Sequence, residues 1–139
     1  MMSGEMPSDI GKLEMLNRAI QGGNQLTRLS GSIPSSIGTL SMMANLDLST
    51  NRIFGSILGE IRSSMTVSSS LNLFNSQLSN EISGSLSGNK VLSHLNLSRY
   101  SMERKLPHSF SPKNYFIMLD LSYNKLTGKV LNSIRSVMT

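Results

Sequence analysis

The sequence predicts a solenoid, a stack of short repeated units with parallel strands along its concave side, and two recurring patterns carry that prediction. The first is a Leu-x-Leu doublet that returns after 25, 24 and 24 residues. The second is a turn of glycine and aliphatic residues, such as SGSIP at 30–34, which recurs in step with the doublet. Repetition at about 20–29 residues is typical of chains whose units bury apolar residues against neighbouring units. The doublets are Leu46/Leu48, Leu71/Leu73, Leu95/Leu97 and Leu119/Leu121.

Each doublet predicts a short strand with both leucines turned inward and the residue between them turned outward. One such strand per unit gives a short parallel sheet on the concave face. A column of asparagines follows the strands, at Asn24, Asn51 and Asn124. We expect these amides to bind backbone groups left unpaired where the chain leaves the strand, and Ser76 to do so more weakly.

The glycine of the second pattern permits a turn after each asparagine. Pro34 and Pro107 then predict extended segments on the convex side, leading to a 3-10 or short helical turn. The first unit is three residues longer than the second, since Asn24 to Asn51 spans 27 residues and Ile33 to Ile57 spans 24. We assign the extra residues to 28–30, as a bulge at a turn. Two apolar columns accompany the turns: Met6, Ile33, Ile57, Ile82, Leu106 and Val130, then Ile10, Ile37, Ile61, Leu86, Phe110 and Ile134.

The 139 residues are predicted to form a single domain of about five and a half repeats. The second and fifth repeats follow the pattern best, whereas the third and fourth are degenerate, with Ser76 and Tyr100 in the asparagine column. The expected boundaries are 13–39, 40–64, 65–88, 89–112 and 113–136, after a partial repeat at 1–12.

Composition narrows the function classes. The chain has no cysteine, so disulfides and thiolate metal sites are excluded, and the absence of a long apolar run gives no expected membrane span. The N-terminus does not read as a signal peptide. The net charge of +5 is concentrated after residue 90. This bias either steers acidic partners to a basic patch or is solvated surface charge, and no nucleic-acid partner is expected. The patch consists of Arg99, Arg104, Lys105 and Lys113.

The segments SGSIPSSIGTLSMMANLDLSTNRIFGSI at 30–57 and LDLSYNKLTGKV at 119–130 resemble the plant-type extracellular leucine-rich repeats. Those repeats occur in ectodomains of receptor-like kinases and receptor-like proteins and in polygalacturonase-inhibiting proteins. The resemblance implies a leucine-rich-repeat solenoid at the cell surface or outside the cell. The sequence departs from the family pattern, because it shows no signal peptide, no cysteine caps and no transmembrane segment. The chain therefore looks like part of a longer ectodomain or a truncated gene product, with uncapped ends suited to end-to-end self-association.

The resemblance also implies that ligands contact the outward residues of the strands. An exposed Phe74 beside Arg99 and Tyr123 has the composition of an interface anchor, although Phe74 covering the gap at Ser76 is an equally weighted interpretation. A ladder of Asp and Asn side chains either binds a polar ligand or solvates the sheet. The candidate ligand-binding residues are Asp47, Asn72, Phe74, His94, Asn96, Arg99, Asp120 and Tyr123.

Other chemistries have little support in the sequence. His94, Asp120 and a serine lie on one predicted face, but an open sheet offers no oxyanion hole, so no catalytic residue and no enzyme activity are predicted. His94 and His108 are too few for zinc, and no metal or other cofactor is expected. Asn96 begins an Asn-Leu-Ser sequon, a glycosylation site if the chain is secreted.

The leading functional prediction is a non-catalytic module that binds a protein or peptide ligand, or an acidic polysaccharide. The first alternative is an inhibitor like the polygalacturonase-inhibiting proteins, which would bind an acidic enzyme or pectin. Ice binding ranks third, because the outward columns mix Phe, His, Arg and Asp instead of forming a regular flat ladder. A gene fragment with no independent role is the fourth hypothesis.

Overall fold

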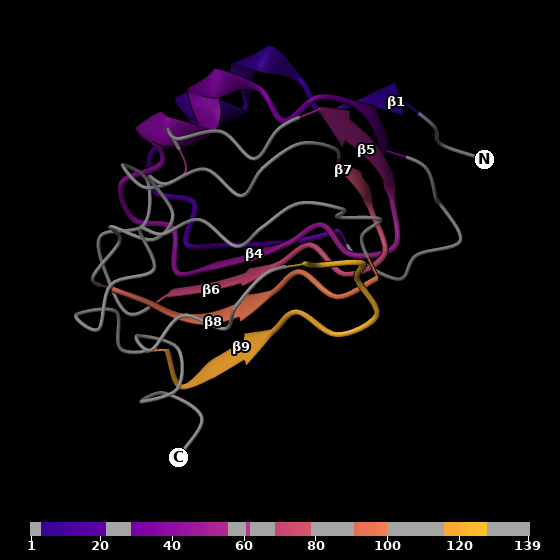
Figure 1. Ribbon diagram of the computed structural model, residues 1–139. Helices are drawn as coiled ribbons and strands as arrows, with labels where there is room; N and C mark the ends of the chain where they lie inside the picture. The colour runs from indigo at the N-terminus through magenta and orange to yellow at the C-terminus, as the bar shows by residue number, and fades with distance from the viewer. Residues whose placement is uncertain are drawn as a thin grey trace.

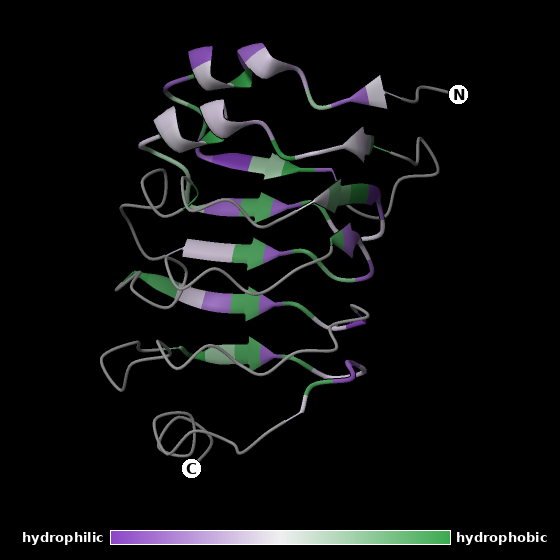
Figure 2. Ribbon diagram, turned by 45° about the horizontal axis from the view of Figure 1, so that its top comes forward, coloured by the Kyte–Doolittle hydropathy of each residue, from purple (hydrophilic) through white to green (hydrophobic). Residues whose placement is uncertain are grey.

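Two parallel sheets run along the stack in the computed structural model, which describes residues 4–21, 29–55, 61, 69–78, 91–99 and 116–127 (Figures 1 and 2). The five-stranded sheet has the order β2 (Arg18–Ile20), β4 (Asn45–Asp47), β6 (Ser69–Asn72), β8 (Leu92–Asn96) and β9 (Met118–Asp120). The four-stranded sheet has the order β1 (Gly4–Glu5), β3 (Leu29–Gly31), β5 (Arg52–Gly55) and β7 (Gln77–Leu78). Each repeat thus contributes its strands in chain order.

The five-stranded sheet confirms the strand prediction. Its partners are equivalent residues of successive repeats, so that Leu46 pairs with Leu71, Leu71 with Leu95 and Leu95 with Leu119. Leu46, Leu71 and Leu95 are at most 1% exposed, because the alternation of a strand turns these side chains into the core. Ala19 pairs with Leu46 and therefore occupies the same position in the first repeat.

The sequence did not predict the four-stranded sheet. It predicted only a glycine turn after each asparagine, followed by an extended segment on the convex side. The partners in this sheet are not equivalent residues. Gly4 pairs with Leu29, Gly31 with Ile53 and Gly55 with Leu78, and each partner lies two residues before the glycine position of its own repeat. Gly31 and Gly55 have φ of 86° and 90°, a backbone region that glycine enters without steric cost.

Two 3-10 helices, η1 (Ser8–Lys12) and η2 (Ser35–Thr39), lie across the core from the five-stranded sheet (Figure 1). Each follows a proline in extended conformation, Pro7 and Pro34, with φ and ψ of −70° and 142° at Pro34. The sequence predicted this for Pro34, and Pro107 lies outside the described residues. The Ser36 hydroxyl donates to the Ser8 carbonyl at 2.6 Å, and the Thr39 hydroxyl donates to the Gly11 carbonyl at 2.8 Å. The helices therefore dock by direct hydrogen bonds.

The core is a row of aliphatic side chains enclosed by the two sheets and the helices. Both predicted apolar columns are buried where the structure describes them, including Ile33 and Ile37 at 2% and 0% exposed. The larger side chains of the core are at most 2% exposed, and they are Ile33, Ile37, Leu40, Met43, Leu46, Leu48, Ile61, Leu71 and Leu73. Within the described residues, no helix is long and apolar enough to cross a membrane.

Asn51 confirms the predicted role of the asparagine column. Its amide donates to the carbonyls of Gln21, Leu48 and Ser49 at 3.0–3.2 Å, and its oxygen accepts the Leu29 N–H at 3.2 Å. One side chain thereby joins the ends of two repeats and the start of β3. Asn124 donates to Leu97 and Leu121 in the same way, both at 2.9 Å.

The serine that replaces asparagine in the third repeat keeps part of this network. The Ser76 hydroxyl donates to the Leu48 carbonyl of the preceding repeat at 3.3 Å. A hydroxyl carries one proton, whereas an amide carries two, so Ser76 bridges the repeats but closes fewer turn contacts. Asn24 lies outside the described residues.

The position assigned to the three extra residues of the first repeat was wrong. Leu29 and Ser30 belong to β3, where they pair with Gly4 and Glu5, and Gly31 pairs with Ile53. These residues therefore occupy regular repeat positions, because Leu29 precedes its glycine by the same two residues as Ile53. The insertion lies before Leu29, in a part of the chain that the structure does not describe.

Candidate ligand-binding face

The outward residues of the five-stranded sheet form the candidate ligand-binding face, and its central row is fixed from within the protein. The side-chain oxygens of Asp47 and Asp120 each accept the backbone N–H two residues later at 2.9 Å. Asn72 and Asn96 do the same at 3.1 and 3.0 Å. The four residues are thus a ladder of Asx turns that terminate the strands.

This ladder has a structural role that neither sequence interpretation contained. The four side chains are half-buried, so part of each is exposed on the face. One oxygen of each side chain accepts a hydrogen bond from a backbone N–H. The Asn72 amide also donates to the second oxygen of Asp47 at 3.1 Å, which links two strands. The ladder therefore presents a fixed polar row, since its rotamers are set before any ligand arrives.

Asp120 has a pKa below its ordinary value. The main cause is the hydrogen bond from the Ser122 backbone N–H, followed by the Ser122 hydroxyl; the Ser98 hydroxyl also lowers the pKa, whereas burial opposes the shift. Hydrogen bonds to the ionised form stabilise it. The turn that terminates β9 therefore favours the ionised form of Asp120.

A second periodic feature lies one residue before the asparagine column. Thr50, Asn75, Arg99 and Tyr123 all have φ between 54° and 58°, the left-handed region that non-glycine residues seldom adopt. The amides of Thr50, Asn75 and Arg99 each donate to a carbonyl of the next repeat, namely those of Phe74, Ser98 and Ser122, at 2.6, 3.2 and 3.0 Å. The backbone thus directs these side chains outward beside the sheet.

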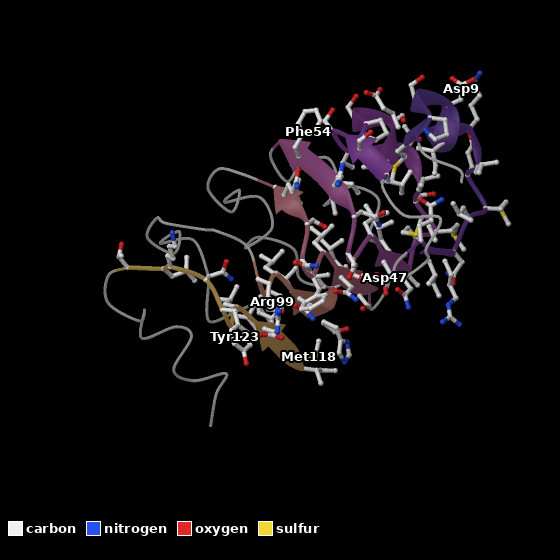
Figure 3. The ribbon with its side chains drawn as sticks, turned by 90° about the vertical axis from the view of Figure 1, so that its right-hand side faces the viewer. Asp9, Asp47, Phe54, Arg99, Met118 and Tyr123 are labelled. Carbon is white, nitrogen blue, oxygen red and sulfur yellow. The ribbon has the colours of Figure 1, made fainter. Side chains whose placement is uncertain are left out.

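Phe74, Arg99 and Tyr123 come together as the sequence suggested. The Arg99 guanidinium carbon lies 5.7 Å from the centre of the Phe74 ring and 4.9 Å from the centre of the Tyr123 ring. Both distances are within the range of a cation–π contact. Figure 3 shows Arg99 and Tyr123 side by side near the last described strand. We call these three residues the arginine stack.

The stack bears on the two interpretations of Phe74. Phe74 is half-buried and lies against Arg99, and Ser76 is buried, with its hydroxyl donating to the Leu48 carbonyl. The two aromatic rings and the cation expected of an interface anchor therefore lie together, and both interpretations of Phe74 stay predictions. Tyr123 is 78% exposed, and its ring is open to solvent beyond the stack.

His94 lies beside the ladder on β8. Its Nδ1 is 2.9 Å from the Ser93 hydroxyl, which in turn donates to the Ser69 carbonyl at 3.1 Å. Because a hydroxyl has one proton, this arrangement favours Nδ1 as the donor to Ser93. Met118, the strand partner of His94, is 45% exposed and adds an apolar surface to the face.

The geometry gives no support to a catalytic triad. His94 is engaged by Ser93 and Asp120 by Ser122, and neither bond connects the histidine to the carboxylate. Among the described residues, no group of three or more His, Asp or Glu side chains is placed to hold a metal ion.

The remaining predicted sites are only partly described. Arg104, Lys105 and Lys113 of the basic patch lie outside the described residues. Asn96 accepts the hydroxyl of Ser98, the third residue of its sequon, at 2.7 Å. The sequon therefore forms a closed turn at the end of β8, on the candidate face.

Comparison with known proteins agrees with this geometry. Residues 116–137 match the sequence family described as Leucine Rich Repeat. The fold is a leucine-rich-repeat solenoid. No curated protein matches the sequence significantly.

The solenoid is similar to ectodomains of plant receptor kinases, which confirms the predicted resemblance. One is the ectodomain of GASSHO1/SCHENGEN3 from Arabidopsis thaliana in complex with CASPARIAN STRIP INTEGRITY FACTOR 2, with a TM-score of 0.87 and 29% identity over 96% of this chain and 16% of that one. Another is the Arabidopsis receptor kinase HAESA in complex with an IDA peptide hormone, with a TM-score of 0.80 and 34% identity over 97% and 22%.

A third similar structure is the BIR3–SERK2 complex from Arabidopsis thaliana, with a TM-score of 0.74 and 31% identity over 93% of this chain and 66% of the other. The solenoid thus spans about a fifth of the HAESA and GASSHO1 ectodomains.

Proposed function

We propose that this chain is a non-catalytic recognition module that binds an extended peptide across the exposed face of its five-stranded sheet. The observation that carries the proposal is the register of that sheet. Equivalent outward residues of successive strands stand in rows, and the Asx turns hold the central row in place. A surface ordered in advance loses little entropy on binding.

The size of the face favours a peptide over a globular partner. Five strands spaced about 4.8 Å apart extend over about 24 Å, and strands of three to five residues are about 10–17 Å long at about 3.3 Å per residue. The resulting face of about 240–400 Å² is smaller than the roughly 800 Å² that each partner buries in a standard protein–protein interface. An extended peptide fits that area. The HAESA structure, which holds a peptide hormone ligand, supports the same ligand class.

The composition of the face supports binding and not chemistry. It combines aromatic, cationic and polar groups, and the open sheet provides no enclosed site from which water is excluded. Following the plant ectodomains that the solenoid resembles, we further propose that the chain works outside the cell. Detection of the tagged protein in the cytosol of plant cells, with none in the apoplast, would contradict that part.

Selection of random twelve-residue peptides displayed on phage, with the full chain immobilised, tests the binding proposal. We expect peptides whose binding is abolished by Ser70→Trp, because Ser70 points outward at the centre of the sheet between Asn45 and His94. Gln77→Trp is the matched control, since it adds the same ring to an exposed strand position in the other sheet. Equal loss in both variants, or no enriched peptide at all, would refute the proposed function.

A further inference from the structure

A β-bulge interrupts the five-stranded sheet at Ser93, beside the candidate ligand-binding face. Ser69 of β6 pairs with Leu92 of β8. The next pair is Ser70 with His94, so Ser93 is an extra residue with no counterpart on β6. Leu92 and Ser93 are consecutive and both buried, at 1% and 8% exposed, although a regular strand turns successive side chains to opposite faces. The bulge thus keeps the Ser93 side chain inside, while the half-buried His94 keeps an outward position.

The buried Ser93 hydroxyl determines which ring nitrogen of His94 carries a proton. Its oxygen lies 3.1 Å from the Ser69 carbonyl oxygen and 2.9 Å from Nδ1 of His94. A carbonyl only accepts, so the single hydroxyl proton is donated to Ser69, and the other bond requires a proton on Nδ1. In a neutral imidazole one nitrogen is a donor and the other is an acceptor. The neutral ring of His94 therefore has its acceptor at Nε2.

Nε2 is the part of His94 that a ligand on the face would meet. The covalent structure of the side chain puts Nδ1 next to the carbon that carries Cβ, and Nε2 at the far end of the ring. No hydrogen bond joins Nε2 to another residue in the part of the chain that the structure describes. Ser70 and Met118, the strand partners of His94, place a hydroxyl and a thioether in the same row. The fold thus presents an oriented acceptor in the row that a peptide blocked by Ser70→Trp would cross.

We infer that Nε2 of His94 accepts a hydrogen bond from an N–H group of the bound peptide. The inference rests on the proposed function and names a residue that selects ligand chemistry on the face. An acceptor whose tautomer is fixed before binding favours an N–H group and disfavours a carbonyl or carboxylate oxygen. The N–H group belongs either to the peptide backbone or to a side chain such as that of Asn, Gln or Trp. His94 is then a specificity-determining residue, and Ser93 is the residue that positions its ring.

Two-bond ¹⁵N–¹H NMR correlation of the free, full chain at pH 8 tests the tautomer. We expect the Nδ1–H form for the His94 signals, which are assigned by their loss in His94→Phe. Ser93→Ala removes the partner of Nδ1–H, so the Nε2–H population should rise. Ser69→Ala is the matched control, because it removes another buried hydroxyl, one that contacts the Val91 carbonyl at 3.5 Å, and keeps the carbonyl that Ser93 uses. A predominant Nε2–H form in the wild type overturns the inference.

Calorimetric titration with a phage-selected peptide that Ser70→Trp blocks tests the contact itself. His94→Phe keeps a planar ring but has no acceptor, and we expect about tenfold weaker binding because the peptide N–H loses its partner. His94→Gln restores an acceptor oxygen at a similar distance from the backbone and should recover part of the affinity. Urea unfolding of both variants should match the wild type, since the side chain is half-buried on the face.

Modified peptides identify the donor. Each backbone N–H is replaced in turn by N-methyl, and each side chain with an N–H is replaced by that of alanine. The modification that removes the donor should weaken binding to the wild type and have little further effect on His94→Phe, because the two groups act as one pair. The sensitive position shows whether the N–H comes from the backbone or from a side chain.

The outcomes separate this inference from the proposed function. If phage-selected peptides bind and Ser70→Trp blocks them, but His94→Phe leaves their affinity unchanged, the face binds peptides and the role of His94 is refuted. Equal losses in His94→Phe and His94→Gln, with no modification whose effect disappears in His94→Phe, also refute that role, since the ring then acts by its shape. Failure to enrich any peptide refutes the proposed function and this inference with it.

Discussion

The first and second repeats place the same residue types in the same columns, yet they are buried to very different extents. Leu13 is 55% exposed, whereas its equivalent Leu40 is 0% exposed. Leu16 is half-buried, whereas its equivalent Met43 is fully buried. The second repeat lies between two others, while no described repeat covers the outer side of the first. Burial in a stack is therefore supplied by the neighbouring unit, and sequence columns alone do not determine it.

The largest test of this comparison is a pair of leucine truncations. We expect Leu40→Ala to lower the free energy of unfolding by about 2–5 kcal/mol, because it leaves a cavity in a closed core. Leu13→Ala, at the equivalent column, should change it by about 0.5 kcal/mol or less. Urea unfolding followed by circular dichroism measures both. Similar losses for the two variants would show that Leu13 is covered in solution.

The contact between η1 of the partial repeat and η2 of the first repeat gives the next largest effect. A Cβ at Gly11 would lie 2.5 Å from both the Ser36 carbonyl oxygen and the Thr39 hydroxyl oxygen, so η1 and η2 must separate in Gly11→Ala. We expect a loss of about 1–3 kcal/mol in urea unfolding, as for other overpacked contacts. Gly4→Ala is the control, since a Cβ there meets nothing within 4 Å. A neutral Gly11→Ala would mean that the helices dock less closely than described.

The exposed apolar side chains of the first repeat predict concentration-dependent association. Leu13, Met15 and Ile20 are 55%, 82% and 54% exposed at the end of the stack. If this end stacks on other copies, the double variant Leu13→Lys with Ile20→Lys should remove the association in sedimentation velocity. Phe54→Lys, at a residue 53% exposed away from that end, should leave it unchanged. A monomeric wild-type chain at all concentrations would exclude end-to-end assembly.

The smallest effect concerns pH at the other end of the described stack. Because the folded-state pKa of Asp120 is lowered, its contribution to stability is present above the unfolded-state pKa, near 3.8, and is lost as pH falls through the lower folded-state value. Asp120→Asn keeps the Asx turn, as Asn96 does one strand away. The urea midpoint of the wild type should therefore fall more between pH 5 and pH 2 than that of the variant. Parallel curves would contradict the assigned cause.

The sequence predicted the parts of the fold that depend on periodic burial. The Leu-x-Leu doublets, the two apolar columns and the asparagine column follow from alternation and from hydrogen-bonding capacity, and the structure confirms them where it describes them. The meeting of Phe74, Arg99 and Tyr123 was also anticipated, because neighbouring repeats bring equivalent columns together.

The missed features depend on backbone geometry. Asp47 and Asn72 were weighed only as ligand-binding or solvating groups, although an Asx residue two positions before an exposed N–H is a turn signal. The second sheet was missed because glycine and proline mark its strands as turns. The residues with left-handed backbone conformation could have been predicted from one feature of the sequence, because each stands one residue before the asparagine column.

The pairing of Gly31 with Ile53, and of Gly55 with Leu78, has a geometric consequence for the whole stack. Strands in the four-stranded sheet slip by two residues per repeat, about 6.6 Å along the strand, while the Leu-x-Leu positions of the five-stranded sheet stay in register from repeat to repeat. Each repeat is therefore displaced along the strand direction in the four-stranded sheet and not in the five-stranded sheet. Repetition of this unequal displacement twists the stack into a superhelix. Further repeats of this kind would wind the ligand-facing rows into a spiral ramp, so a peptide lying along them would have to climb and twist with the protein.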